Sequence, residues 1–178
     1  MLERLDTINW SALHHAHGEA SDVPILLRTT LSQIKEERDF AFQLLHETIW
    51  HQGTVYEASA HVVPFLWEMI QSPETPDKPS VVFLLASLAN GHPYLKGHAV
   101  YSEETEERFR KFLAKDGLEL EAEMAKEERW VAETREAVGQ GLPFLYPYLD
   151  RGDSHIKWCV AQALACYPEH AQETVPLL

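Results

Sequence analysis

Val23-Pro24-Ile25-Leu26 and Val63-Pro64-Phe65-Leu66 are the stretches that decide the fold, because the same short motif recurs at an interval of about 40 residues. The pattern returns at Leu142-Pro143-Phe144-Leu145, after about twice this interval, and again at Val175-Pro176-Leu177-Leu178, after a somewhat shorter one. Since the second interval is close to twice the first, one unit lacks the motif or is replaced by something else. A helical unit that recurs about every 40 residues is typical of stacked helix pairs.

Apolar periodicity predicts two helices in each of the first two units. In the first unit, Asp22 is the expected N-cap of a helix that runs to about residue 33. Its partner over 36–51 stops before Gly53, a residue type that commonly ends helices. The sequence therefore predicts an antiparallel helix pair over residues 21–53.

The second unit repeats this organisation. A helix over 54–71 is expected to begin with the capping box Thr54-Val55-Tyr56-Glu57 and to bend at Pro64. Its partner runs over about 79–90 and ends at Gly91. A shift by one repeat, which places Pro24 on Pro64, also superimposes the apolar positions of the two partner helices: Leu44, Leu45 and Thr48 fall on Leu84, Leu85 and Leu88. This match supports the repeat independently of the proline motif.

A charged segment interrupts the repeats, because residues 103–136 contain 12 acidic and 7 basic side chains. We interpret it as two amphipathic helices broken near Asp116-Gly117, the alternative being an acidic surface for a basic partner. The whole chain is then one domain, 1–178. Its predicted parts are an N-terminal cap (1–20), repeats (21–53 and 54–92), a charged helical insertion (93–129), a repeat (130–170) and the start of an incomplete repeat (171–178).

The sequence stops at Leu178, where a further helix of the Val-Pro-Leu-Leu type begins. A helix pair without its second member leaves an apolar edge uncovered, whereas repeat arrays normally end in polar caps. Two interpretations stay open. The chain is a piece of a longer protein, which we favour, or this C-terminal edge packs on a partner such as a second copy.

Helix pairs with this period and a proline in the first helix resemble HEAT repeats, to which armadillo-like and PBS-lyase superhelices are related. More narrowly, the segments 8–13, 22–28 and 51–58 look like those of a bacterial group of HEAT-repeat proteins of undefined role. The resemblance covers residues 5–92 well and 130–178 loosely. It implies an all-α, right-handed superhelix of antiparallel helix pairs that serves as a binding scaffold.

Composition excludes several functional classes. Fifteen Lys and Arg against 28 Asp and Glu give a net charge of −13, which disfavours binding to nucleic acid or to an anionic membrane. The first ten residues lack the apolar stretch of a secretory signal. Cys159 and Cys166 are seven residues apart, about 10 Å along a helix, too far for a disulfide. We expect a cytoplasmic chain whose partner is another protein, in one interpretation a basic one.

Histidine-rich stretches prompt a search for metal ligands. His14-His15-x-His17 lacks regular ligand spacing, and His155 with Cys159 gives only two ligands. His46-Glu47 is similar to the pairs with which HEAT-repeat deoxyhypusine hydroxylase binds iron, but that site needs several such pairs. Because the common nucleophile and phosphate-binding motifs are also missing from the sequence, we expect no catalytic residues, no metal and no cofactor.

One helix face is unusual for a solvated surface, because it carries a tryptophan. On the helix 36–51, this face holds Asp39, Gln43, His46 and Trp50. Phe83 and Asn90 follow Gln43 and Trp50 one repeat later, and a comparable face of the third pair has Trp158 and Gln162. Exposed aromatic side chains are typical binding anchors. We predict a partner-binding stripe of these eight residues, unless segment 103–136 folds over it and buries it.

His51-Gln52-Gly53-Thr54-Val55-Tyr56-Glu57 also allows two interpretations. A glycine stop followed by a threonine cap explains it structurally, and a functional turn presenting His51, Tyr56 and Glu57 is the alternative.

These features favour a non-catalytic protein-binding scaffold that uses the concave face of the helix array. One alternative is an accessory or lyase-like enzyme subunit that holds a small chromophore or metal. Another is an acidic immunity or inhibitor protein that covers a basic toxin.

Overall fold

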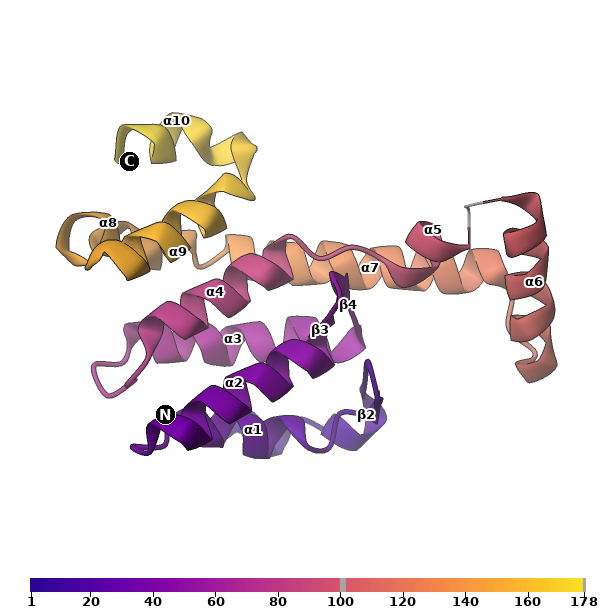
Figure 1. Cartoon of the computed structure of the whole chain (residues 1–178), viewed down its shortest axis with the longest axis horizontal. Helices are drawn as coiled ribbons and strands as arrows, with labels where there is room; N and C mark the ends of the chain where they lie inside the picture. The colour runs from indigo at the N-terminus through magenta and orange to yellow at the C-terminus, as the bar shows by residue number, and fades with distance from the viewer. Residues whose placement is uncertain (100–101, 178) are drawn as a thin grey trace.

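The computed structural model describes residues 1–99 and 102–177. Within them the chain is predominantly helical and contains two antiparallel two-stranded hairpins (Figure 1). The helical fold is confirmed, and the expectation of a purely α chain was wrong at the hairpins. No helix in the described ranges has both the length and the apolar character that crossing a membrane requires.

The α-helices fall close to the predicted positions in the first two units. Their bounds are α1 (Val23–Thr29), α2 (Lys35–Ile49), α3 (Glu57–Gln71), α4 (Lys78–Ala89), α5 (Tyr94–His98), α6 (Glu103–Leu113), α7 (Leu120–Gly139), α8 (Tyr146–Arg151), α9 (Ser154–Ala165) and α10 (Ala171–Thr174).

Short elements connect these helices. The 3₁₀ turns are η1 (Glu3–Thr7), η2 (Trp10–Ala12), η3 (Ala114–Asp116), η4 (Leu142–Leu145), η5 (Pro168–His170) and η6 (Val175–Leu177). The strands are β1 (His14–His15), β2 (Gly18–Glu19), β3 (Trp50–His51) and β4 (Thr54–Val55). Of the helix expected at 175–178, the described part is η6, and Leu178 lies outside the described residues.

The helices pack in pairs around one main core. α1 packs on α2 and α3 on α4, while α7 packs on both α3 and α4 and α9 packs on α4 (Figure 1). α3 lies at the centre and is apolar on most sides, with nine buried residues, so Pro64 is accommodated within one helix that continues to Gln71. Gly141 is required beside this core, because a Cβ there would lie 2.1 Å from the ring of Trp67.

The segment between α2 and α3 is a β-hairpin, which corrects two predictions. Helix α2 ends at Ile49, and Gln52-Gly53 forms the turn with φ of 52° and 94°, as a type I′ hairpin requires. Helix α3 begins after Tyr56 instead of at Thr54, and its start is held by Ser59, whose Oγ accepts from Tyr56 N–H (2.8 Å). Thr54 therefore pairs in a strand and caps no helix.

The expected helix caps give a mixed result. For a helix over 156–166 the sequence offers Ser154 or Asp153 as the cap. Asp153 caps α9, accepting from the backbone N–H groups of His155 (2.9 Å) and Ile156 (3.0 Å). Asp22 precedes α1 but its side chain caps no helix; it lies 2.9 Å from Nε2 of the buried His15. The Asp22 carboxylate therefore contacts His15 instead of the first backbone N–H groups of α1.

We call residues 94–99 and 102–130 the arm, and residues 1–93 and 131–177 the block. The arm projects from the block, with α6 at its far end (Figure 1). The predicted break near Asp116-Gly117 is confirmed, since Gly117 follows η3 with φ of 72°. The boundary expected between 129 and 130 falls inside α7, which is continuous from Leu120 to Gly139. A single helix thus belongs to both the arm and the block.

Candidate functional site

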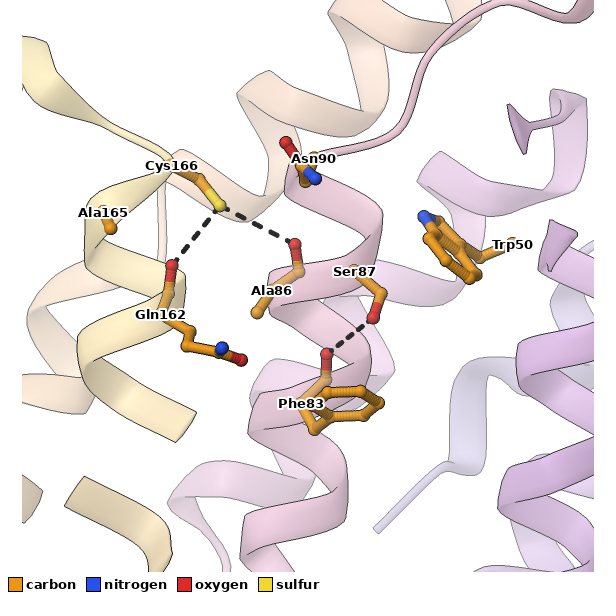
Figure 2. A pocket seen from close by; sticks show the side chains of 8 residues that line it. All are labelled: Trp50, Phe83, Ala86, Ser87, Asn90, Gln162, Ala165 and Cys166. Carbon is orange, nitrogen blue, oxygen red and sulfur yellow. Dashed lines mark hydrogen bonds between the residues drawn. The ribbon is translucent and has the colours of Figure 1, made fainter. Parts of the chain in front are cut away.

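A surface groove of about 390 Å³ crosses α4 between β3 and α9 (Figure 2). Four of the eight predicted stripe residues line it: Trp50, Phe83, Asn90 and Gln162. The other lining residues are small or polar, namely Ala86, Ser87, Ala165 and Cys166. α9 packs directly on α4, so these small residues form the floor of the groove and the larger ones stand around it.

A second groove of about 230 Å³ continues the first toward the start of α2. Gln43 and His46, two further residues of the predicted stripe, line it on the α2 side. Phe83 lines both grooves and is 41% exposed, so the two form one continuous surface. We call the two together the α4 groove.

His46 connects α2 to α4 through its ring. Its Nε2 lies 3.0 Å from Ser87 Oγ, and that hydroxyl donates to the Phe83 carbonyl (3.0 Å), so Nε2–H is the donor to Ser87. The imidazole stacks on Phe83 at 5.6 Å between ring centroids and lies 4.4 Å from Trp50. Burial lowers the pKa of His46, against a smaller opposite effect of Glu47. A neutral imidazole therefore holds the two aromatic rings in position.

Trp50 has an unpaired donor at the edge of the α4 groove. Its indole Nε1 is buried and has no hydrogen-bond partner among the described residues. A buried donor without a partner costs about 1–3 kcal/mol relative to a paired one. The Trp50 side chain lines the groove, but this nitrogen is enclosed, so an acceptor on a bound molecule reaches it only if the ring turns.

Two predicted stripe residues lie outside the α4 groove. Asp39 pairs with Lys35 one turn earlier on α2 and lines neither part of the groove. Trp158 lies on α9 one turn before Gln162, is 53% exposed and also lines neither part. Helical spacing identified the helix faces that carry these two residues. It did not show which side chains of those faces border the groove.

The sequence interpretation missed the floor of the groove. Ser87 follows Phe83 by four residues and precedes Asn90 by three, so helical spacing could have identified it. Cys166 is half-buried at the groove, with Sγ 3.4 Å from the Gln162 carbonyl. Burial raises the pKa of its thiol, which favours the neutral form. Contacts between α4 and α9 decide this placement, and these helices are distant in sequence.

The charged segment does not cover this surface. No residue of the described part of 103–136 lines the α4 groove. α6 lies at the far end of the arm, and α7 packs on the side of α3 and on α4. The alternative that residues 103–136 bury the stripe is therefore wrong.

Histidines gather at the two hairpins without forming a metal centre. The ring of His17 lies 5.3 Å from that of His51, while His14 Nδ1 lies 3.3 Å from Glu57 Oε2. His15 Nδ1 accepts from the His17 N–H, and its Nε2 faces Asp22. Among the described residues, no group of three or more His, Cys, Asp and Glu side chains is arranged to hold a metal ion. These contacts join β1–β2 to the neighbouring helices.

Comparisons of the chain with protein-family models, with curated proteins and with solved structures gave no match. The resemblance to HEAT repeats therefore rests on the residues quoted above.

Proposed function

We propose that this chain is a non-catalytic protein-binding scaffold, built as a HEAT-like superhelix of helix pairs, and that the α4 groove holds the partner. The observation that carries the proposal is the pairing of exposed aromatic surface with an unpaired donor. Phe83 is 41% exposed within the groove, and Trp50, which also lines it, has an enclosed indole N–H that no described residue accepts. Partially exposed aromatic rings beside polar groups are typical of the energetic centre of protein interfaces.

The chemistry of the groove favours a peptide surface over a small charged ligand. Its polar lining consists mostly of neutral groups, among them the hydroxyl of Ser87 and the amides of Asn90 and Gln162. Glu47 adds one carboxylate to the second part, and no Lys or Arg lines either part. Backbone amides and apolar side chains of a partner match such a lining. The net charge of −13 supports a basic partner, which the acidic surface would attract over a distance of about one Debye length.

Substitutions in the groove test this proposal. Phe83→Ala and Trp50→Ala should each reduce capture of the partner from a lysate of the source cells at least about tenfold, as expected for anchors at an interface centre. Trp50→Phe keeps an aromatic ring and removes only the N–H, so it should have a smaller effect.

The control is Phe144→Ala, because Phe144 is 44% exposed and does not line the groove. Equal capture by Phe83→Ala and the unmodified chain, with both folded by circular dichroism, would remove the α4 groove as the binding site.

The accessory-enzyme alternative predicts a bound metal or chromophore. Structural metal sites in proteins usually need three or four protein ligands, and no such group is arranged among the described residues. We therefore expect less than about 0.1 equivalent of iron or zinc in the purified chain. Elemental analysis together with an absorption spectrum checks this. One equivalent of either metal, or a visible absorption band, would support the enzyme-subunit alternative instead.

A further inference from the structure

The second part of the α4 groove is a small hollow whose lining combines aromatic rings with a carboxylate. Its volume of about 230 Å³ is below the roughly 300–1,000 Å³ of pockets for drug-sized molecules, so it suits a single long side chain. Phe42, His46 and Phe83 line it, and Phe83 is 41% exposed. Glu47 lies beside them on α2, with its side chain 54% exposed. Aromatic rings next to a carboxylate are typical of sites that hold a cationic group.

The polar groups of this hollow are able to accept hydrogen bonds. Ser80 Oγ donates its proton to Asp77 Oδ2 (2.7 Å), so its lone pairs are left to accept. Gln43 contributes an amide carbonyl from α2. Because His46 Nε2–H donates to Ser87, the other ring nitrogen, Nδ1, carries a lone pair. The lining therefore matches a ligand that is rich in N–H donors.

Glu47 keeps its negative charge in this hollow. Its one ion-pair contact among the described residues is with His51, where Oε2 lies 3.3 Å from Nδ1 without hydrogen-bond geometry. Burial lowers the pKa of His46, so the adjacent imidazole adds no positive charge near pH 7. The Glu47 carboxylate is thus available to a cation from outside the chain.

The nearest lysines along the chain are engaged elsewhere. Lys35 begins α2 and pairs with Asp39. Lys78 begins α4 and donates to the Ile70 carbonyl and the Tyr148 hydroxyl, both at 2.9 Å. Neither lines the hollow, so no lysine of these two helices occupies the place of a bound cation.

We propose that this hollow holds an arginine side chain of the partner protein. The inference rests on the proposed function, because it names one group of the partner that the α4 groove binds. A guanidinium is planar, so it stacks on the exposed part of the Phe83 ring while its N–H fork donates to Glu47. A lysine ammonium is compact and strongly hydrated, and it has no flat face to stack. The net charge of −13 attracts a segment that carries arginine.

Three blocked tripeptides of defined charge test this assignment by NMR titration of the isotope-labelled full chain. Acetyl-Ala-Arg-Ala-amide should give saturable shifts at Gln43, Glu47 and Phe83, with a Kd of about 1–10 mM. The citrulline peptide has nearly the same shape without the charge, and it should bind at least about fivefold more weakly. The lysine peptide should bind about threefold more weakly than the arginine peptide.

Variants with matched controls locate the binding. Glu47→Gln should reduce the preference for arginine over citrulline to about twofold or less, since the charge partner is removed. Phe83→Leu keeps an apolar side chain without the ring, and it should weaken arginine binding about fivefold. Glu36→Gln removes the same charge from α2 about 16 Å earlier along the helix. Phe40→Leu removes an α2 ring that is 60% exposed outside the hollow. Both control variants should bind arginine as the unmodified chain does.

Several results would overturn the assignment. They are the absence of saturable shifts up to about 20 mM arginine peptide, equal binding of the citrulline or lysine peptide, and an unchanged arginine preference in a Glu47→Gln variant that is folded by circular dichroism. Capture of the partner by Phe83→Ala and Trp50→Ala is a separate measurement. If capture is lost in those variants while the arginine peptide does not bind, the arginine assignment fails and the α4 groove remains the binding site. If capture is unaffected, the proposed function itself fails.

Discussion

The block and the arm are built from the same kind of helix but are held together differently. In the block, α3 and α4 contribute eight and seven buried residues to one continuous core. In the arm, the buried residues are Leu95, Ala99 and Leu120, with a few partly buried neighbours. Charged side chains dominate the remaining arm contacts, as in the pairing of Lys96 with Glu128 (2.8 Å). The block should therefore resist local unfolding better than the arm.

The largest expected effect comes from the core of the block. Leu85→Ala removes a fully buried side chain from α4, which packs on α3, α7 and α9. We expect a loss of about 2–5 kcal/mol in the free energy of unfolding and a fall in Tm of roughly 5–15 °C. Urea denaturation followed by circular dichroism measures it. A loss below about 1 kcal/mol would contradict the view that α4 is central to the core.

A smaller and local effect is expected in the arm. Leu120→Ala removes the more deeply buried of the two leucines in the arm core. Because few other buried contacts hold α5 and α6 on α7, amide hydrogen exchange should accelerate at least about tenfold across the described arm, while the Tm of the block falls by less than about 3 °C. Equal acceleration in α3 would show that block and arm unfold as one unit.

The smallest expected effect concerns how stability changes with pH. This change should have opposite signs at His46 in the block and at Glu127 in the arm. Burial lowers the pKa of His46 below its ordinary 6.5, so the folded chain binds this proton less well than the unfolded chain. Its contribution to stability is complete above pH 6.5 and is lost as the pH falls below it. In the arm, burial raises the pKa of Glu127 above 4.5, against the opposing effect of the Leu95 N–H that it accepts at 2.7 Å. Its contribution is present below pH 4.5 and is lost as the pH rises through its higher folded pKa.

Acidification should therefore weaken the contact between α2 and α4 and strengthen the attachment of α5 to α7. His46→Gln should reduce the fall in unfolding free energy between about pH 7 and pH 5, an effect of about a few tenths of a kcal/mol because the ring is only half-buried. Glu127→Gln keeps an acceptor for the Leu95 N–H and removes the ionisation. Arm protection in that variant, corrected for intrinsic exchange, should no longer decrease as the pH rises above 4.5. An unchanged pH dependence in either variant would contradict the assignment for that residue.

The periodic helices of the block could be predicted because their signals are local. The apolar spacing in α2 and α4, and Asp153 before α9, act over one or two helical turns, and each lies where it was expected. The β3–β4 hairpin was missed because its strands are too short to show alternation. Gln52 gave no signal either, since a residue other than glycine rarely adopts a positive φ. The pattern Thr54-x-x-Glu57 matches a capping box, although Thr54 lies in strand β4.

The α4 groove could be predicted only in part, because contacts between helices distant in sequence shape it. Helical spacing identified the aromatic residues on α2 and α4, but it did not separate Trp158 from the groove or find Cys166 within it. Burial of the stripe under residues 103–136 was an equally good prediction from sequence. The structure excluded it, since no residue of 103–136 lines the groove and α7 leads outward to α6 at the far end of the arm.

By itself, the amino-acid sequence determined that residues 21–92 form two helix pairs about 40 residues apart, because turn-by-turn apolar spacing and helix-ending residues act between neighbours in the chain. Only the tertiary structure decided that α4 and α9 meet, that Trp50 is left without an acceptor, and that the arm projects from the block. Those features depend on contacts between residues dozens of positions apart, and such contacts are set by how whole helix faces fit together.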